Sequence, residues 1–188
     1  MTMRPLEVSE YKEIIELIQK GFTYAEGNKE KHFRANTQMA LALTLQANIG
    51  LRIGDVLELK LANFKGNKLE VREDKTDKLQ YRDINSAITQ LVLEYALDKR
   101  LNKSDNLFNI GVRAIQKQLK IICNYLGLEN ISTHSFRKMY ATLQYEANNH
   151  NLELIKELLN HSSISTTQRY IRVSQQAINK ASSDFFID

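Results

Sequence analysis

The chain has 188 residues, of which 43% are apolar and 26% are charged, a composition typical of a globular domain rather than a disordered chain. No apolar run approaches the roughly 20 residues that a membrane helix needs, and the N-terminus lacks the apolar core of a secretory signal. The formal net charge of +4 and the pI of about 9.1 are compatible with a polyanionic partner but do not require one. The single cysteine, Cys123, cannot form an internal disulfide, which favours a reducing cytoplasm.

The chain is expected to be mostly helical, because one proline and seven glycines in 188 residues leave few helix breakers. Ser9 is a suitable N-cap for a first helix. A second helix is predicted over residues 37–47, and the glycine of Asn48-Ile49-Gly50 is expected to end it. A short helix over residues 53–60 should follow.

An antiparallel hairpin is expected next, because polar and apolar residues alternate in two neighbouring segments. These are Lys68-Leu-Glu-Val-Arg-Glu and Leu79-Gln-Tyr-Arg-Asp-Ile, with Asp74-Lys75-Thr76-Asp77 at the tip. Helical periodicity then predicts helices over five segments: Ile88 to Tyr95, Ile115 to Leu126, Ser135 to Ala147, Leu152 to Leu159 and Ser174 to Ala181. With no repeat or long linker, residues 1–188 are predicted to form one mainly α domain with a small antiparallel β-sheet.

Polar residues that are ordinary one at a time form an ordered series along the chain. The series is Gly50-Leu-Arg52 with Asp55, Lys75, Thr133-His134-Ser-Phe-Arg137, Leu159-Asn-His161, and Thr166-Thr-Gln-Arg-Tyr170. Here the sequence resembles the tyrosine recombinase (phage integrase) family. The signature of that family is an arginine after Gly-Leu, a hairpin lysine, a His-x-x-Arg box, and a histidine box with a tyrosine nine residues later. The resemblance covers about residues 5–179 and implies the catalytic-domain fold of the family.

The resemblance implies that the chain cleaves and rejoins DNA without a metal or any other cofactor. Arg52 and Arg137 would pair with the non-bridging oxygens of a phosphodiester, and Tyr170 would attack it to form a 3′-phosphotyrosyl link. The other implied roles are general acid for Lys75, acid–base partner for His134, hydrogen-bond donor for His161, and orientation of the arginine for Asp55. Expected DNA contacts are Lys138, Arg169 and Lys78.

Each of these residues also has an ordinary structural explanation. Taken alone, Tyr170 is a surface tyrosine, and His161 is a histidine at a helix end before a serine N-cap. Arg52 and Asp55 form an i, i+3 pair that would be worth only a few tenths of a kcal/mol. The order and spacing of the whole series favour the functional interpretation.

Several details stay open at the level of sequence. The general acid is either Lys75 or Lys78, and Lys75 is preferred because its separation from Arg52 fits the family better. The sequence departs from the family at Asn160, where glycine is usual, and at Lys138, where histidine is frequent. The four histidines have no metal-site spacing, so no metal site is expected.

The resemblance also implies partners and a domain organisation. Family members generally carry a core-binding domain before the catalytic domain, and we expect it to be absent here because about four residues precede the first helix. Double-stranded DNA and self-association into a tetramer on DNA are expected, with room for accessory DNA-bending proteins and no role for a membrane. We expect a bacterial or phage protein of the cytoplasm, associated with the nucleoid. The tail over residues 171–188 should contain a helix, either exchanged between protomers or folded onto its own core.

The leading hypothesis is a site-specific recombinase, or integrase, of a phage or mobile element. The alternatives are a type IB topoisomerase-like nicking-closing enzyme, a non-catalytic DNA-binding relative, and an unrelated helical protein with chance matches. A topoisomerase would relax supercoils without strand exchange, and a non-catalytic relative would bind DNA without a covalent adduct. The sequence does not identify the DNA target or separate integration from excision and resolution.

Overall fold

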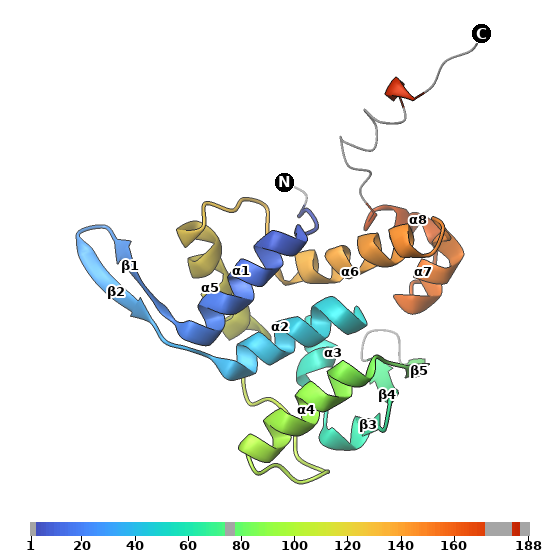
Figure 1. Ribbon diagram of the computed structural model, residues 1–188, viewed down its shortest axis with the longest axis horizontal. Helices are drawn as coiled ribbons and strands as arrows, with labels where there is room; N and C mark the ends of the chain where they lie inside the picture. Colours follow the sequence, from blue (N-terminus) through green and yellow to red (C-terminus); the bar gives the residue numbers. More distant parts are fainter. Residues whose placement is uncertain (1–2, 74–77, 172–181, 185–188) are drawn as a thin grey trace. The chain divides into compact units, whose positions relative to one another are not determined.

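The computed structural model describes residues 3–73, 78–171 and 182–184 (Figure 1). The chain divides into two compact units, residues 1–140 and 141–188. The first unit contains, in chain order, α1 (Val8–Lys20), β1 (Phe22–Glu26), β2 (Lys29–Phe33), α2 (Thr37–Ile49), α3 (Ile53–Leu57), the 3-10 helix η1 (Leu61–Asn63), β3 (Phe64–Lys65), β4 (Lys68–Glu73), β5 (Lys78–Asp83), α4 (Ser86–Asp98) and α5 (Val112–Tyr125). The helix α6 (Thr133–Ala147) starts in the first unit and ends in the second, which also contains α7 (Leu152–Leu158) and α8 (Ile164–Gln168).

The helix α2 forms the centre of the first unit, because its residues are buried on every side. It packs against α1, α3 and α4, and a helix that is apolar all round is stable only in such a core. The side chain of Asn36 caps its start by accepting a hydrogen bond from the amide of Met39. Gly50 ends it in the left-handed conformation, with φ of 75°, so the predicted glycine stop is confirmed.

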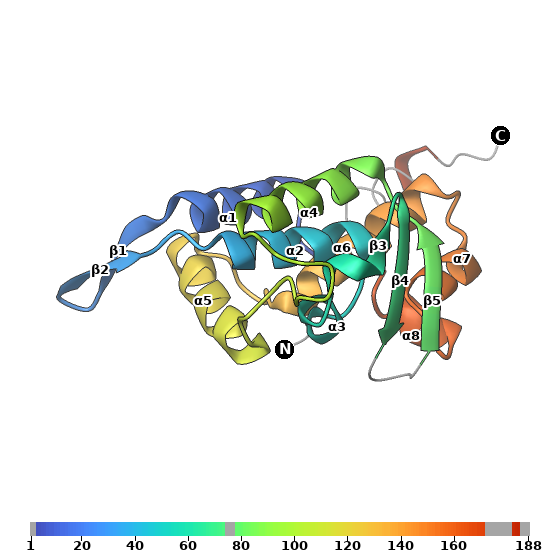
Figure 2. The same ribbon diagram turned by 90° about the horizontal axis from the view of Figure 1, so that it is seen from below.

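A three-stranded antiparallel sheet with the order β3-β4-β5 lies at one end of the first unit (Figure 2). The predicted hairpin is confirmed as the pair β4 and β5, with Leu69 opposite Arg82 and Val71 opposite Gln80. Leu69 and Val71 alternate with polar residues and are buried, as expected for a sheet with one face on the core. The hairpin tip, residues 74–77, lies outside the described residues.

A second antiparallel hairpin, β1 and β2, projects from the opposite end of the first unit (Figures 1 and 2). The sequence analysis did not predict it. Its base is held by aromatic packing: the Phe22 ring stacks on Phe33 at 5.1 Å between centroids and meets Tyr125 of α5 at 4.5 Å. Gly27, with φ of 61°, supplies the positive φ that a tight turn between such strands requires.

Most predicted helices are present, but the ends of two of them differ from the prediction. The first helix begins at Val8 with Glu7 as its N-cap, so the choice of Ser9 was wrong. The expected helix over residues 53–60 stops at Leu57. The predicted helix over residues 174–181 lies outside the described residues.

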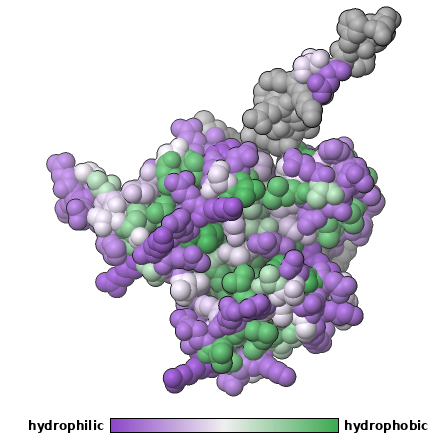
Figure 3. All heavy atoms as spheres, in the orientation of Figure 1, coloured by the Kyte–Doolittle hydropathy of each residue, from purple (hydrophilic) through white to green (hydrophobic). Residues whose placement is uncertain are grey.

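On the face seen in Figure 3 hydrophilic side chains are widespread, and apolar side chains are exposed over α4 among other places. Leu93 and Leu97 of this helix are 51% and 80% exposed. In the part of the chain that the structure describes, every helix is too short or too polar to cross a membrane.

Candidate active site

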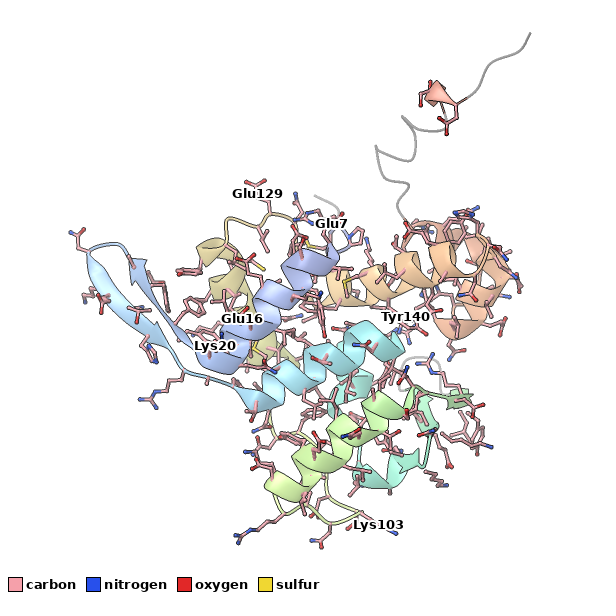
Figure 4. The ribbon with its side chains drawn as sticks, in the orientation of Figure 1. Glu7, Glu16, Lys20, Lys103, Glu129 and Tyr140 are labelled. Atoms are coloured by element: carbon pink, nitrogen blue, oxygen red, sulfur yellow. The ribbon has the colours of Figure 1, made fainter. Side chains whose placement is uncertain are left out.

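The segment that carries Arg52 is fixed against α6 by a close contact of Gly50. A Cβ built on Gly50 would lie 2.3 Å from Cδ1 of Tyr140, so only glycine lets the backbone approach this ring. Figure 4 shows Tyr140 beside the end of α2. Arg52 follows two residues later as the N-cap of α3, so the contact sets the position of Arg52 relative to α6.

Serines define the start of α6. The amide of His134 donates to the hydroxyl of Ser132 at 3.3 Å, and the amide of Ser132 donates to the hydroxyl of Ser135 at 3.1 Å. These contacts satisfy backbone donors that a helix start leaves without helical partners. The turn that presents His134 and Arg137 is thereby well defined.

His134, Arg137 and Tyr140 follow one another at three-residue spacing, so each lies about one turn of α6 from the next. His134 is exposed, whereas the Arg137 side chain lies in the interior, with 1% of its surface exposed. A buried guanidinium loses its hydration, and proteins keep such a group only where its charge is compensated. Burial also restricts the rotamers of the Arg137 side chain.

Asp55 lies next to Arg52, as the sequence suggested. Oδ2 of Asp55 is 3.8 Å from Nη1 of Arg52, and the aspartate side chain is nearly inaccessible at 4% while the arginine side chain is 23% exposed. At this distance the contact is an ion pair rather than a short hydrogen bond. Asp55 is therefore close enough to attract Arg52, whose side chain keeps part of its surface exposed.

The second unit brings His161 and Tyr170 together. Their rings meet edge to face with centroids 4.8 Å apart. Nδ1 of His161 lies 3.1 Å from the hydroxyl of Thr167, and the amide of Tyr170 donates to the carbonyl of Thr167 at 2.8 Å. Thr167 thus contacts His161 through its hydroxyl and the backbone of Tyr170 through its carbonyl oxygen.

Local backbone geometry turns His161 inward. Asn160 has φ of 53°, the left-handed conformation that asparagine tolerates better than most residues, so it takes the place of the glycine usual in the family. The amide of His161 then donates to the carbonyl of Lys156 at 3.0 Å, and the imidazole is buried with 6% exposed. Ser163 caps α8, the short helix that carries Thr167.

A scan against family models matches residues 5–177 to the phage integrase family. The chain belongs to this family. Among curated relatives it is 31% identical over 150 residues to the tyrosine recombinase XerC of Caldanaerobacter subterraneus subsp. tengcongensis, covering 74% of this chain and 42% of the relative. It is 30% identical over 143 residues to the probable integrase/recombinase YoeC of Bacillus subtilis, covering 71% and 77%. The tyrosine recombinase XerA of Pyrococcus horikoshii is 27% identical over 177 residues, covering 87% and 60%.

Solved structures of phage integrase relatives share the fold. A structure of XerH recombinase in a post-cleavage complex with a palindromic difH substrate superposes with a TM-score of 0.73 at 23% identity, over 95% of this chain and 52% of that one. The catalytic domain of bacteriophage HP1 integrase gives 0.67 at 17% identity, over 96% and 94%. The predicted fold, a mainly α tyrosine recombinase catalytic domain with small antiparallel sheets, is confirmed. The chain spans about half the length of several of its relatives.

Two of the family's expected residues are not described in full. Lys75 lies outside the described residues, and only the backbone of Lys78, the first residue of β5, is described. The choice between these lysines as general acid stays a prediction. Arg169 is exposed at the end of α8, where a DNA contact is sterically open.

Lys138, for which a DNA contact is predicted, lies largely inside the protein in this structure, and that contact stays a prediction. The side chain is nearly buried, with 9% exposed, and Nζ donates to the carbonyl of Met3 at 2.6 Å. This geometry favours a role inside the protein over a contact with a phosphate.

The sequence analysis also missed two residues around Gly50. Arg82 of β5 donates to the carbonyl of Ile49, and Tyr140 packs on Gly50 itself. Burial raises the pKa of the Tyr140 phenol, and the positive charges of Arg82 and Arg137 oppose this rise. The three-residue spacing of Tyr140 from Arg137 was a usable signal for Tyr140. For Arg82 the sequence offered no signal beyond the many lysines and arginines of residues 60–82.

Proposed function

We propose that this chain carries the catalytic machinery of a site-specific tyrosine recombinase, which cleaves and rejoins double-stranded DNA through Tyr170. The observation that carries the proposal is the edge-to-face packing of Tyr170 on His161 at 4.8 Å, inside the segment matched to the family. This contact supports the proposal because Tyr170 and His161 are the residues that the resemblance implies as nucleophile and hydrogen-bond donor.

The proposed reaction is an in-line displacement at phosphorus. The Tyr170 oxygen gives up its proton to His134 and forms a bond to the phosphorus as the bond to the 5′ oxygen breaks. The leaving 5′ oxygen takes up a proton from Lys75 or Lys78 and becomes a 5′-hydroxyl. Rejoining is the reverse displacement by a 5′-hydroxyl. Because the phosphotyrosyl link conserves the energy of the broken bond, no nucleotide cofactor is consumed.

Charge on the non-bridging oxygens is the main barrier to this displacement, since it grows as the phosphorus is attacked. We assign its neutralisation to Arg52 and Arg137, whose planar guanidiniums pair bidentately with phosphate oxygens. His161 would donate a hydrogen bond to the same oxygens, and His134 would act as acid–base partner for Tyr170. Because Arg137 is 1% exposed, the proposal requires that DNA binding uncovers its guanidinium.

DNA is the proposed partner because the family acts on it and because two relatives were solved on DNA, XerH with its difH substrate and the Tn1549 transposon integrase with circular intermediate DNA. We further propose assembly into a tetramer on DNA, with accessory DNA-bending proteins in some reactions. The cytoplasm of a bacterium or a phage host is the proposed location. Arg169 is the described candidate for a phosphate contact.

The proposal is tested with nicked suicide duplexes drawn from a randomised pool by binding to the protein. We expect a covalent protein–DNA adduct on a denaturing gel that the Tyr170→Phe variant does not form. Tyr125→Phe, which alters an exposed tyrosine of α5, is the matched control and should form the adduct normally. Binding without any adduct would indicate a non-catalytic relative, and relaxation of supercoils without strand exchange would indicate a topoisomerase-like enzyme.

The arginine assignment makes a separate prediction. Arg137→Ala or Arg52→Ala should lower the rate of adduct formation by several orders of magnitude, because each removes a donor pair from the charged transition state. Arg137→Lys should recover only part of the rate, since an ammonium cannot reproduce the bidentate geometry. Single-turnover cleavage rates check this, and near-wild-type rates for either alanine variant would refute the assignment.

A further inference from the structure

The start of α6 is tied to the first residues of the described chain. We call residues 3–6 the N-terminal strap. The amide of Arg4 donates to the carbonyl of Asn130 at 3.0 Å and that of Leu6 to the carbonyl of Ser135 at 3.4 Å. Lys138 adds a third bond, from Nζ to the carbonyl of Met3 at 2.6 Å. The strap therefore contacts the loop before α6 and the first two turns of the helix.

The other side of the strap is anchored on α1. The Arg4 guanidinium makes two hydrogen bonds to the Glu10 carboxylate, at 2.7 and 2.6 Å, and Nε of Arg4 donates to the carbonyl of Glu129 at 3.2 Å. Leu6 is buried with 4% exposed. With α1 on one side and α6 on the other, the strap couples the position of the helix start to the core of the first unit.

Lys138 is the one side chain of α6 that reaches the strap through a described hydrogen bond. It follows Arg137 directly and lies one helical turn after His134. A lysine that is 91% buried loses most of its hydration, so its ammonium is retained only with good acceptors. The bond to Met3 provides one at a distance typical of charge-assisted hydrogen bonds.

From this geometry we propose that Lys138 is a positioning residue, which fixes the first turns of α6, and with them His134 and Arg137, by holding the N-terminal strap. The inference rests on the proposed function, because the two positioned residues are those assigned to the cleavage reaction. This positioning role is proposed in place of the direct contact of Lys138 with DNA that the sequence suggested.

The test compares Lys138→Met, which keeps an unbranched side chain but removes the donor, with Lys12→Met, which alters an exposed lysine of α1. We expect Lys138→Met to slow single-turnover cleavage of the suicide duplex by about 10-fold or more, the size usual for groups that orient a reacting side chain. Amide hydrogen exchange at Arg4 and Leu6 should become faster in the same variant. Lys12→Met should change neither, and Lys138→Arg should restore part of the cleavage rate.

The salt dependence of DNA binding separates positioning from a phosphate contact. A direct contact of Lys138 with phosphate predicts that Lys138→Met lowers the slope of log affinity against log salt by about 1. We expect an unchanged slope. Arg4→Ala, which removes the anchor on Glu10, should slow cleavage in the same way, although Arg4 has no part in the chemistry.

A reduced slope, or normal cleavage by folded Lys138→Met, would overturn the proposal. Unchanged exchange at Arg4 and Leu6 would also overturn it. If the wild-type protein formed no adduct, the proposed function would fail, but the exchange rates would still decide whether Lys138 holds the strap.

Discussion

Gly50 is the residue on which the placement of Arg52 depends most directly. It combines two demands that only glycine meets: a φ of 75° and a backbone that touches the Tyr140 ring. Arg82 adds a hydrogen bond to the neighbouring Ile49 carbonyl. The turn before Arg52 is thus fixed by α6 and β5 together.

Gly50→Ala should be strongly destabilising, because its Cβ would overlap Tyr140 in addition to straining the backbone. Gly27→Ala is the matched control, since Gly27 also has positive φ but no atom within 4 Å of a built Cβ. We expect about 1 kcal/mol for Gly27→Ala from strain alone and about 3 kcal/mol for Gly50→Ala once overpacking is added. Urea unfolding measures the free energy of unfolding of both variants. Equal decreases would show that the overlap with Tyr140 does not add to the destabilisation.

Cys123 gives a prediction for the pH dependence of stability. Burial raises the pKa of its thiol to about 11, above the range of roughly 8.5–9 for an unfolded chain. The folded state therefore keeps the proton longer, so this contribution to stability is complete below about pH 9 and falls as the pH rises towards 11. The unfolding free energy of the wild type minus that of Cys123→Ala should decrease between pH 8 and 10.5, and a constant difference would contradict the assignment.

At the scale of elements, the two candidate regions are built on helix ends. The first turn of α6 presents His134 under serine capping, and the loop between α7 and α8 turns His161 inward through Asn160. Helix ends carry backbone groups and side chains that face away from the helical ladder, so they present functional groups in defined directions. The short α8 adds Thr167, on which His161 and Tyr170 both depend.

Thr167→Val should slow cleavage by about 10-fold, because it removes the hydroxyl that contacts Nδ1 of His161 while keeping the shape of the side chain. Thr166→Val is the control: it loses a hydroxyl contact with Ser163 on the same helix but none with His161. The pH profile of single-turnover cleavage should also shift for Thr167→Val alone. Identical profiles for the two variants would exclude an orienting role for Thr167.

Elements with long periodic patterns could be predicted from the sequence, and short ones could not. The helix α5, with Ile115 and Leu119, could be predicted because its apolar residues recur over several turns. The strands β1 and β2 and the helix α8 have five residues each, too few for a period to stand out. The hairpin of β1 and β2 is also stabilised by a contact distant in sequence, that of Phe22 with Tyr125.

At the scale of the whole molecule, the order of motifs predicted the family and fold but not which candidates lie together. Arg52, His134 and Arg137 belong to the first unit, and His161 and Tyr170 to the second, a division that linear order does not reveal. The DNA contact of Lys138 stays a prediction, but its position beside the N-terminal residues could not be foreseen from the sequence. Its bond to Met3 joins residues 135 positions apart, and no local pattern encodes such a contact.

The proposed nucleophile, Tyr170, can be identified chemically in the adduct formed with a nicked suicide duplex. Digestion of that adduct and mass spectrometry of the peptides locate the attached nucleotide. We expect the nucleotide on the peptide that contains Tyr170, linked through a 3′-phosphate to the phenolic oxygen. An adduct on any other residue, or one that persists in Tyr170→Phe, would contradict the assignment of Tyr170 as nucleophile.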